Sequence, residues 1–266
     1  SQPKYWSEGL FLGEPRFFNH KNVYFPGRVP VIFRANDPAY MTPDALARAV
    51  REVGGLVHNN HPDAGAEGRD QWDYSESARS VIANTEMGPD TTCYEGSTYE
   101  IGLEHTVNEH LQSGGRTGFV AGSDTHESRP SAHTAVFARA LTRAALFEAL
   151  RSRRNYAITY ARIRLELTID GHLMGEEFST RAPPRIHATA FGTAPIREIA
   201  LIRDGAVLVA GSADCDHAVL DLVDSSFAEL PSGRTTYYYL RVTQADQDPQ
   251  GNPSMAWSSP IWVTKE

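Results

Sequence analysis

Residues 118–130, GFVAGSDTHESRP, contain the side chains whose types and spacing most clearly suggest chemistry. Asp124 and His126 are two positions apart, so in an extended chain both side chains point to the same side. They follow an apolar stretch that is typical of a buried strand, and α/β proteins place ligands and metals at strand ends. A carboxylate and an imidazole can together bind a metal ion. The alternative is a turn in which Asp124 caps backbone groups and His126 is solvated.

Three further histidines border predicted strands. His20 precedes NVYF, and His58 and His61 lie in HNNHP. Because His58 and His61 are three residues apart, they face opposite sides of an extended chain, and only one need be a ligand. His61, which precedes a proline at the strand end, is the better candidate, and His58 is either a core histidine or one that supports a ligand. With Asp124 and His126 they resemble a hydrolytic metal site.

The composition bounds the class of protein. The chain has 266 residues, 41% of them apolar, and a net charge of -8. This charge, without a basic stripe interleaved with aromatic residues, argues against nucleic-acid binding. The chain contains no run of 18 apolar residues, so no transmembrane helix is expected. The sequence does not open with a charged-then-apolar leader, so it predicts no signal peptide. The localisation stays open between periplasmic, secreted and cytoplasmic.

The elements that must position these residues change in kind near residue 160. Before it, strands alternate with helices that begin at the N-caps Thr42 and Thr142, which predicts a mostly parallel sheet or a barrel. After it, short strands separated by turn residues predict a β-sandwich. One of these strands is expected to run through residues 256–263. We therefore expect two domains, 1–160 and 161–266.

Four segments extend the argument to a family. FNHKNVYF, GLVHNNHP, GFVAGSDTHESRP and LFEALRSRRNYAITYARIRLELTIDG, in this order and spacing, resemble the PHP (polymerase and histidinol phosphatase) superfamily, in its carbaryl-hydrolase-like branch of bacterial hydrolases. YYYLRVTQ and MAWSSPIWV are similar to the β-sandwich that follows the PHP domain in that branch. The resemblance implies a fold of the α/β plus all-β class. It would be a distorted, TIM-like (β/α)7 barrel, incomplete at its N-terminus, followed by a small β-sandwich.

The resemblance also implies roles for individual residues. Two or three divalent ions (Zn, Mn or Fe) would lie at the C-terminal ends of the barrel strands. The family's metal-binding histidines and aspartate match His20, His61, Asp124 and His126. Glu8, or else Glu14, would match a bridging glutamate. Arg129 would bind a substrate anion or support a metal ligand, with an ordinary surface ion pair as the alternative. His58 and Arg129 are therefore the expected catalytic residues.

Two departures from the family pattern matter. The family opens with an HxH strand that supplies metal ligands, and the chain contains no such segment. Since a parallel barrel cannot leave an inner strand edge open, we expect a further N-terminal segment or a second chain to complete it. At Ile82 the branch commonly has a glutamate, and Glu86 either substitutes for it or is unrelated.

The expected function is metal-dependent hydrolysis of a small-molecule ester, either a phosphoester or a carbamate or aryl ester. A bound metal lowers the pKa of its water from near 16 toward roughly 7, which makes hydroxide available at neutral pH. The alternative is a degenerate, non-catalytic barrel that serves as a binding or structural module. In that alternative the sandwich would bind a glycan or a protein, whereas its expected role is that of a structural cap or a homo-oligomerisation surface.

Overall fold

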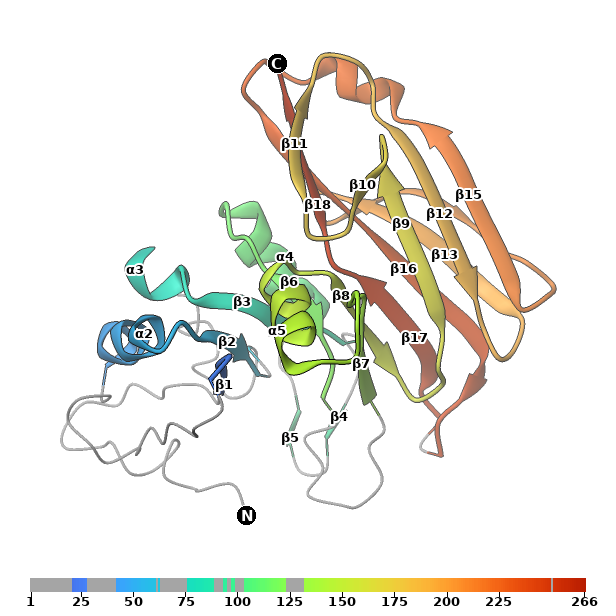
Figure 1. The fold of residues 1–266 in the computed structure, drawn as a ribbon. Coiled ribbons are helices and arrows are strands. Elements are labelled where there is room, and N and C mark those ends of the chain that lie inside the picture. The colour runs from blue at the N-terminus through green and yellow to red at the C-terminus, as the bar shows by residue number, and fades with distance from the viewer. Residues whose placement is uncertain are drawn as a thin grey trace.

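The computed structural model describes residues 21–27, 42–60, 62, 76–88, 93–94, 97–98, 103–122, 132–249 and 251–266. Within these ranges, strands predominate and form sheets of four, four and eight strands together with a two-stranded ladder (Figure 1). The ladder joins β4 (Cys93–Tyr94) to β5 (Ser97–Thr98). No helix in the described ranges combines the length and the apolar character needed to cross a membrane.

The first four-stranded sheet has the order β1-β2-β3-β6. Its strands are β1 (Lys21–Tyr24), β2 (Leu56–Asn59), β3 (Ile82–Glu86) and β6 (Gly118–Val120). β2, β3 and β6 are parallel, while β1 is antiparallel to β2. The C-terminal ends of the three parallel strands therefore meet at one edge, as the alternation of strands and helices predicts.

The described residues before β8 (Asn155–Thr159) also form four helices. They are α2 (Pro43–Glu52), α3 (Glu76–Arg79), α4 (Leu103–Gln112) and α5 (Arg143–Arg151). The two predicted N-caps are confirmed: the hydroxyl of Thr42 accepts a hydrogen bond from the backbone N–H of Ala45 at 3.1 Å, and Thr142 does the same for Ala145 at 3.2 Å. Each hydroxyl satisfies a backbone donor that the first helical turn leaves without a partner.

The second half of the chain forms two packed layers. The small sheet contains β10 (His172–Leu173), β9 (Arg164–Ile169), β12 (Arg185–Phe191) and β15 (His217–Val223), in that order. The large sheet contains β11 (Glu177–Thr180), β18 (Ile261–Lys265), β16 (Thr235–Gln247), β17 (Pro253–Ser258), β8 (Asn155–Thr159) and β7 (Ala132–Val136), with β13 (Ile196–Arg203) and β14 (Ala206–Gly211) beside β16. A 3-10 helix, Ser225–Glu229, precedes β16. The expected strand over residues 256–263 is in fact two, β17 and β18.

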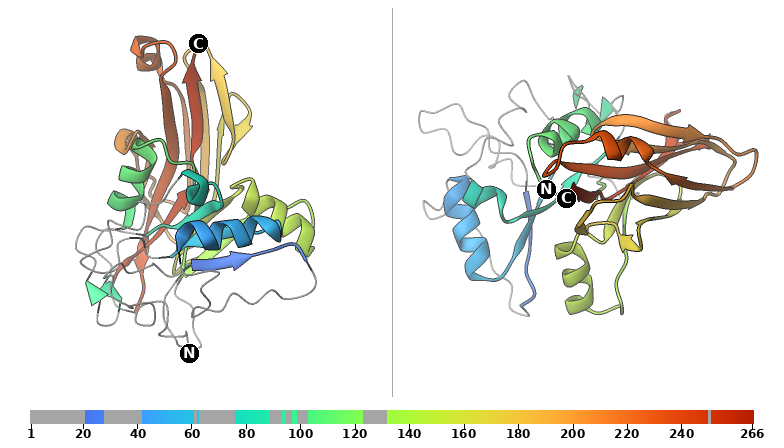
Figure 2. Two further views of the ribbon diagram at one scale, coloured as in Figure 1. Left: turned by 90° about the vertical axis from the view of Figure 1, so that its left-hand side faces the viewer. Right: turned by 90° about the horizontal axis from the view of Figure 1, so that it is seen from above.

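Strand β16 is buried on both faces. Tyr238, Leu240 and Val242 belong to the core between the two layers. Tyr237 and Tyr239 point the other way, into a second core that also contains residues of α4 and β6 and Met87, which follows β3. Because alternate side chains of a strand face opposite sides, the run TTYYYL needs apolar partners on both sides. Figure 2 shows α4 lying against the large sheet, on the side away from the small one.

The predicted (β/α)7 barrel is wrong. Within the described ranges the parallel sheet stays open, and β7 and β8, which follow it, pair antiparallel in the large sheet. The outer edge of β6 is closed by side chains: Ser259 Oγ accepts from the Phe119 N–H at 2.8 Å, and the Asn155 amide donates to the Phe119 carbonyl at 2.6 Å. Side-chain groups thus take the place of a further backbone ladder.

The domain boundary at residues 160–161 stays a prediction. The large sheet contains strands from both sides of it, since β8 pairs with β17 through Ala157 and Trp257. The two predicted domains are therefore joined by a continuous hydrogen-bonded sheet.

Replacing Ser259 with alanine should lower the free energy of unfolding by about 1–3 kcal/mol. Ser259 is fully buried, and its loss would leave the Phe119 N–H without its acceptor away from water. Urea unfolding measures the effect, with the exposed Ser212→Ala as the matched control, expected within about 0.5 kcal/mol of wild type. Equal unfolding midpoints for the two variants would show that the hydroxyl does not stabilise the edge.

Candidate functional site at the end of the parallel strands

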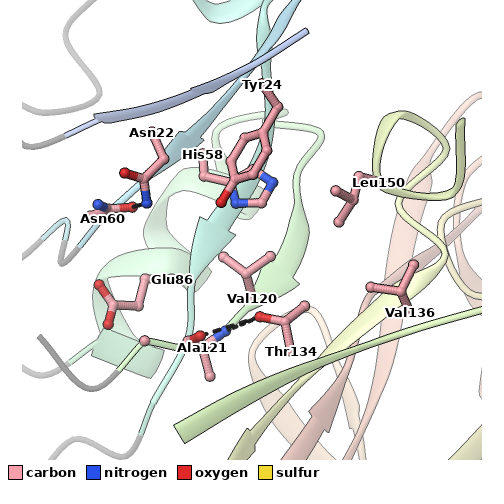
Figure 3. Close-up of a pocket in the computed structure, with 11 residues that line it drawn as sticks. Asn22, Tyr24, His58, Asn60, Glu86, Val120, Ala121, Thr134, Val136 and Leu150 are labelled. Carbon is pink, nitrogen blue, oxygen red and sulfur yellow. Dashed lines mark hydrogen bonds between the residues drawn. The ribbon is translucent and has the colours of Figure 1, made fainter. Parts of the chain in front are cut away.

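A pocket of about 300 Å³ opens at the C-terminal ends of the parallel strands (Figure 3). Its wall combines residues of β1, the three parallel strands, β7 and α5. They are Asn22, Tyr24, His58, Asn60, Glu86, Val120, Ala121, Gly122, Thr134, Val136 and Leu150. In Figure 3, Asn22, Asn60 and Glu86 lie on one side of the view, and Leu150 and Val136 lie on the other. The pocket therefore has a polar side and an aliphatic side.

The strand alternation explains which residues reach the pocket. Asn22 pairs with His58 across β1 and β2, His58 pairs with Asn84 across β2 and β3, and Asn84 pairs with Gly118. Paired residues in adjacent strands project from the same face of a sheet. Two residues further along β3 on the same face, Glu86 pairs with Val120.

His58 is buried in this wall. Its ring lies against Tyr24, with ring centroids 4.2 Å apart. Burial lowers the pKa of His58 to about 3 and raises the pKa of the Tyr24 hydroxyl. Both side chains are therefore uncharged at neutral pH.

The other polar side chains are held by neighbours. The Asn22 amide donates to Asn60 Oδ1 at 3.2 Å. The Thr134 hydroxyl accepts from the Ala121 N–H at 3.0 Å and lies 3.2 Å from the Ala121 carbonyl. The Glu86 carboxylate is buried and packs closely against Gly122, where an added Cβ would lie 3.3 Å from Oε1. Ligand pockets commonly place a few polar or charged side chains in a mostly apolar wall.

Of the predicted site residues, the structure places His58 in the pocket. The others lie outside the described residues: His20, His61, Asp124, His126, Glu8 and Arg129. The described ranges contain no group of three or more His, Cys, Asp or Glu that could hold a metal ion. Asp124 and His126 follow Gly122 by two and four residues along the chain.

The sequence patterns assign no role to Asn22, Tyr24, Asn60 or Thr134. They give Glu86 only as a substitute for the glutamate that the family branch commonly has at Ile82, or as unrelated to it. A signal for Glu86 is present in the strand IANTE, where Asn84 and Glu86 stand two positions apart, next to the apolar Ile82 and Ala83. Polar residues at alternate positions of such a strand share one face, and burying them requires partners or a function. No comparable signal marks Thr134, whose contact with Ala121 depends on the packing of β7 against β6.

Comparison with known proteins identifies the family. Residues 71–221, more than half of the chain, match the family described as "Protein of unknown function (DUF3604)". An uncharacterized protein of Chlamydia pneumoniae is 37% identical over 183 residues, which are 59% of this chain and 28% of that protein. An uncharacterized protein of Chlamydia trachomatis is 32% identical over 243 residues, 81% of this chain and 37% of that protein. The chain thus spans about a third of the length of these relatives.

Among solved structures, a fibronectin(III)-like module of Clostridium thermocellum CbhA aligns with 37% of this chain and 94% of its own, at 18% identity and a TM-score of 0.23. So low a score does not indicate a shared fold.

The predicted membership of the PHP superfamily is wrong, and so are the PHP domain and the TIM-like barrel that it implied. The family model that matches is a different one, and the strands after β6 build a sandwich in place of a barrel. Short histidine motifs at strand ends were over-read, because such motifs occur in many α/β proteins. The chain belongs to the DUF3604 family.

Proposed function

We propose that this chain is a metal-dependent hydrolase that cleaves ester bonds in small molecules, phosphoesters or carbamate and aryl esters. The observation that carries the proposal is the buried carboxylate of Glu86 in the wall of a pocket at the ends of three parallel strands. This position in an α/β sheet is where ligands bind most often. Because the chain spans about a third of its relatives, the activity of a complete relative is part of the proposal.

The donor chemistry of the pocket fits a divalent cation bound through oxygen. Glu86 supplies a buried carboxylate, a donor that Zn, Mn and Fe all accept. Nε2 of His58 is not available as a metal ligand, because the Asn84 amide nitrogen lies 3.3 Å from it. The proximity in sequence of Asp124 and His126 to Gly122 supports them as further ligands. A bound metal would supply an acidified water and polarise the ester oxygen.

The chain's own residues would bind and orient the substrate. Val136 and Leu150 offer an aliphatic surface to the organic part of an ester, while Asn22 and Asn60 lie on the polar side. Glu86 would hold the metal. The neutral Tyr24 hydroxyl is a hydrogen-bond donor suited to an ester oxygen.

Replacing Glu86 with glutamine should lower kcat/KM by at least about 100-fold, because the neutral amide is a poor metal ligand and cannot accept a proton. The assay uses chromogenic phosphoesters and aryl carbamates with added Zn²⁺, Mn²⁺ or Fe²⁺. The exposed Glu109→Gln is the matched control and should keep wild-type activity.

Metal analysis of the purified protein accompanies the assay. Bound metal that Glu86→Gln loses would support the proposal. Bound metal without turnover of any of these esters would contradict the hydrolase. Less than one metal per chain together with no turnover would favour a binding or structural module.

A further inference from the structure

The amide of Asn84 has a fixed orientation. Its nitrogen donates to the backbone carbonyl of Leu150 in α5 at 2.9 Å. Because a carbonyl only accepts, the NH2 group must face Leu150, and the reverse orientation would place two oxygens together. Asn84 is fully buried, and a Cβ at Gly118 would lie 2.4 Å from Asn84 Oδ1, so this glycine makes room for the amide.

The same nitrogen lies 3.3 Å from Nε2 of His58. An amide NH2 has two hydrogens and accepts no hydrogen bond, so its second hydrogen is directed at the imidazole. Nε2 must therefore carry the lone pair, and the ring proton of neutral His58 is on Nδ1. In the described part of the chain, Asn84 Oδ1 is buried without a hydrogen-bond partner. An orientation that leaves an acceptor unsatisfied is costly and suggests a role for the histidine contact.

We infer that Asn84 is a positioning residue that holds His58 as its Nδ1–H tautomer, and that His58 is a neutral hydrogen-bond donor to a negatively polarised oxygen of the pocket ligand. Such an oxygen belongs to a phosphoryl group or to an ester carbonyl. The catalytic part of this inference rests on the proposed function, whereas the tautomer does not.

Two observations define what His58 would do. The lone pair of Nε2 is engaged by Asn84, so this atom is not available as a general base or a metal ligand. The buried ring, with its pKa lowered to about 3, stays neutral at neutral pH. A neutral donor held in a buried wall stabilises negative charge that develops on an oxygen without transferring its proton.

Nitrogen NMR of the full chain labelled with ¹⁵N-histidine tests the tautomer. The chain has ten histidines, and the signals missing from His58→Phe identify those of His58. At about pH 7 we expect a protonated Nδ1 and an unprotonated Nε2. Asn84→Asp should reverse the pattern, because a carboxylate only accepts and would draw the proton to Nε2. A protonated Nε2 in the wild-type protein would overturn the inference, whether or not Asn84→Asp folds.

Inorganic phosphate and the ester assay test the donor role. Phosphate should shift the Nδ1–H signal, and His58→Phe, which keeps a ring without N–H, should lower kcat about 100-fold with a smaller change in KM. A kcat within about threefold of wild type would show that His58 is not a donor to the reacting oxygen. If the tautomer and phosphate shift are found but no ester is cleaved, the proposed hydrolase fails and the donor assignment stands.

Discussion

Expressed without residues 161–266, the segment 1–160 should fail to fold cooperatively. Its helix α4 and strand β6, together with Met87 after β3, share their core with the large sheet. The buried residues on the N-terminal side of this core are Met87, Val107, Leu111, Phe119 and Ala157. Those contributed by the C-terminal side include Tyr237, Tyr239, Trp257 and Trp262.

The reason is the size of the burial energy that the segment would lose, compared with the stability of a whole domain. Fully burying one large apolar side chain contributes about 1.5–3 kcal/mol, whereas a whole domain is stable by only about 5–15 kcal/mol. Removing four such side chains from one core would therefore cost about 6–12 kcal/mol, an amount as large as the whole margin of stability. The cut would also remove β17 from β8 and the Ser259 hydroxyl from β6.

Thermal unfolding followed by circular dichroism, together with amide hydrogen exchange, tests the segment. We expect no sigmoidal transition and no slowly exchanging amides from 1–160 alone. Coexpression of 1–160 with 161–266 is the control. The two segments should form a complex that shows a sigmoidal transition and slowly exchanging amides. A cooperative transition from 1–160 alone would show that the predicted boundary separates independent folding units.

Replacing Glu104 with alanine should destabilise the protein by about 3–5 kcal/mol, because the change breaks a buried ionic network. Glu104 of α4 is 7% exposed. Its carboxylate accepts hydrogen bonds from the Tyr239 hydroxyl at 2.7 Å, the Trp257 indole N–H at 3.1 Å and the Arg241 guanidinium at 3.3 Å. Alanine would leave the indole without its acceptor and Arg241 with Glu198 alone.

The geometry of α4 explains why the network is extensive. Asn108, one turn after Glu104, donates to the Tyr239 hydroxyl at 3.0 Å and accepts from the Tyr237 hydroxyl at 2.9 Å. Residues four apart on a helix rise about 6 Å, close to the spacing of alternate residues on a strand. Two helical residues therefore meet alternate residues of β16.

Urea unfolding measures the loss for Glu104→Ala. Glu109→Ala is the matched control, because Glu109 is on the same helix with its side chain 58% exposed, and its effect should stay within about 0.5 kcal/mol. Glu104→Gln should be intermediate, since the amide oxygen can still accept from Tyr239 or Trp257. A loss below about 1 kcal/mol for Glu104→Ala would show that the contacts contribute little to stability.

The predicted starts of α2 and α5 agree with the structure. Thr42 and Thr142 cap their helices as predicted, because a cap needs only a hydroxyl and the backbone of the next turn. The prediction of one strand over residues 256–263 is wrong, because Ser259 and Pro260 separate β17 from β18. Proline lacks the N–H that a central ladder needs, so this break was readable from the sequence.

For the candidate site, the sequence indicated the edge of the sheet but few of the residues. His58 was placed among the expected site residues, and it lines the pocket. The contacts that define its chemistry come from residues far along the chain. Asn84, which faces its Nε2, is 26 residues from His58. Leu150, which fixes the Asn84 amide, is 66 residues from Asn84. The first contact depends on the register of β2 and β3 and the second on the packing of α5 against the sheet, and no local pattern encodes either of them.

The sequence by itself determined the starts of α2 and α5, and the change from alternating helices and strands to strands alone. These follow from side-chain periodicity and capping, which act within a few residues. Only the tertiary structure decided that the parallel sheet stays open in the described ranges. Its edge is closed by Ser259, which is 140 residues from Phe119. The physical reason is that a backbone N–H donates to any suitable acceptor, whether a carbonyl of a neighbouring strand or a side-chain oxygen, and the tertiary structure decides which acceptor lies within reach.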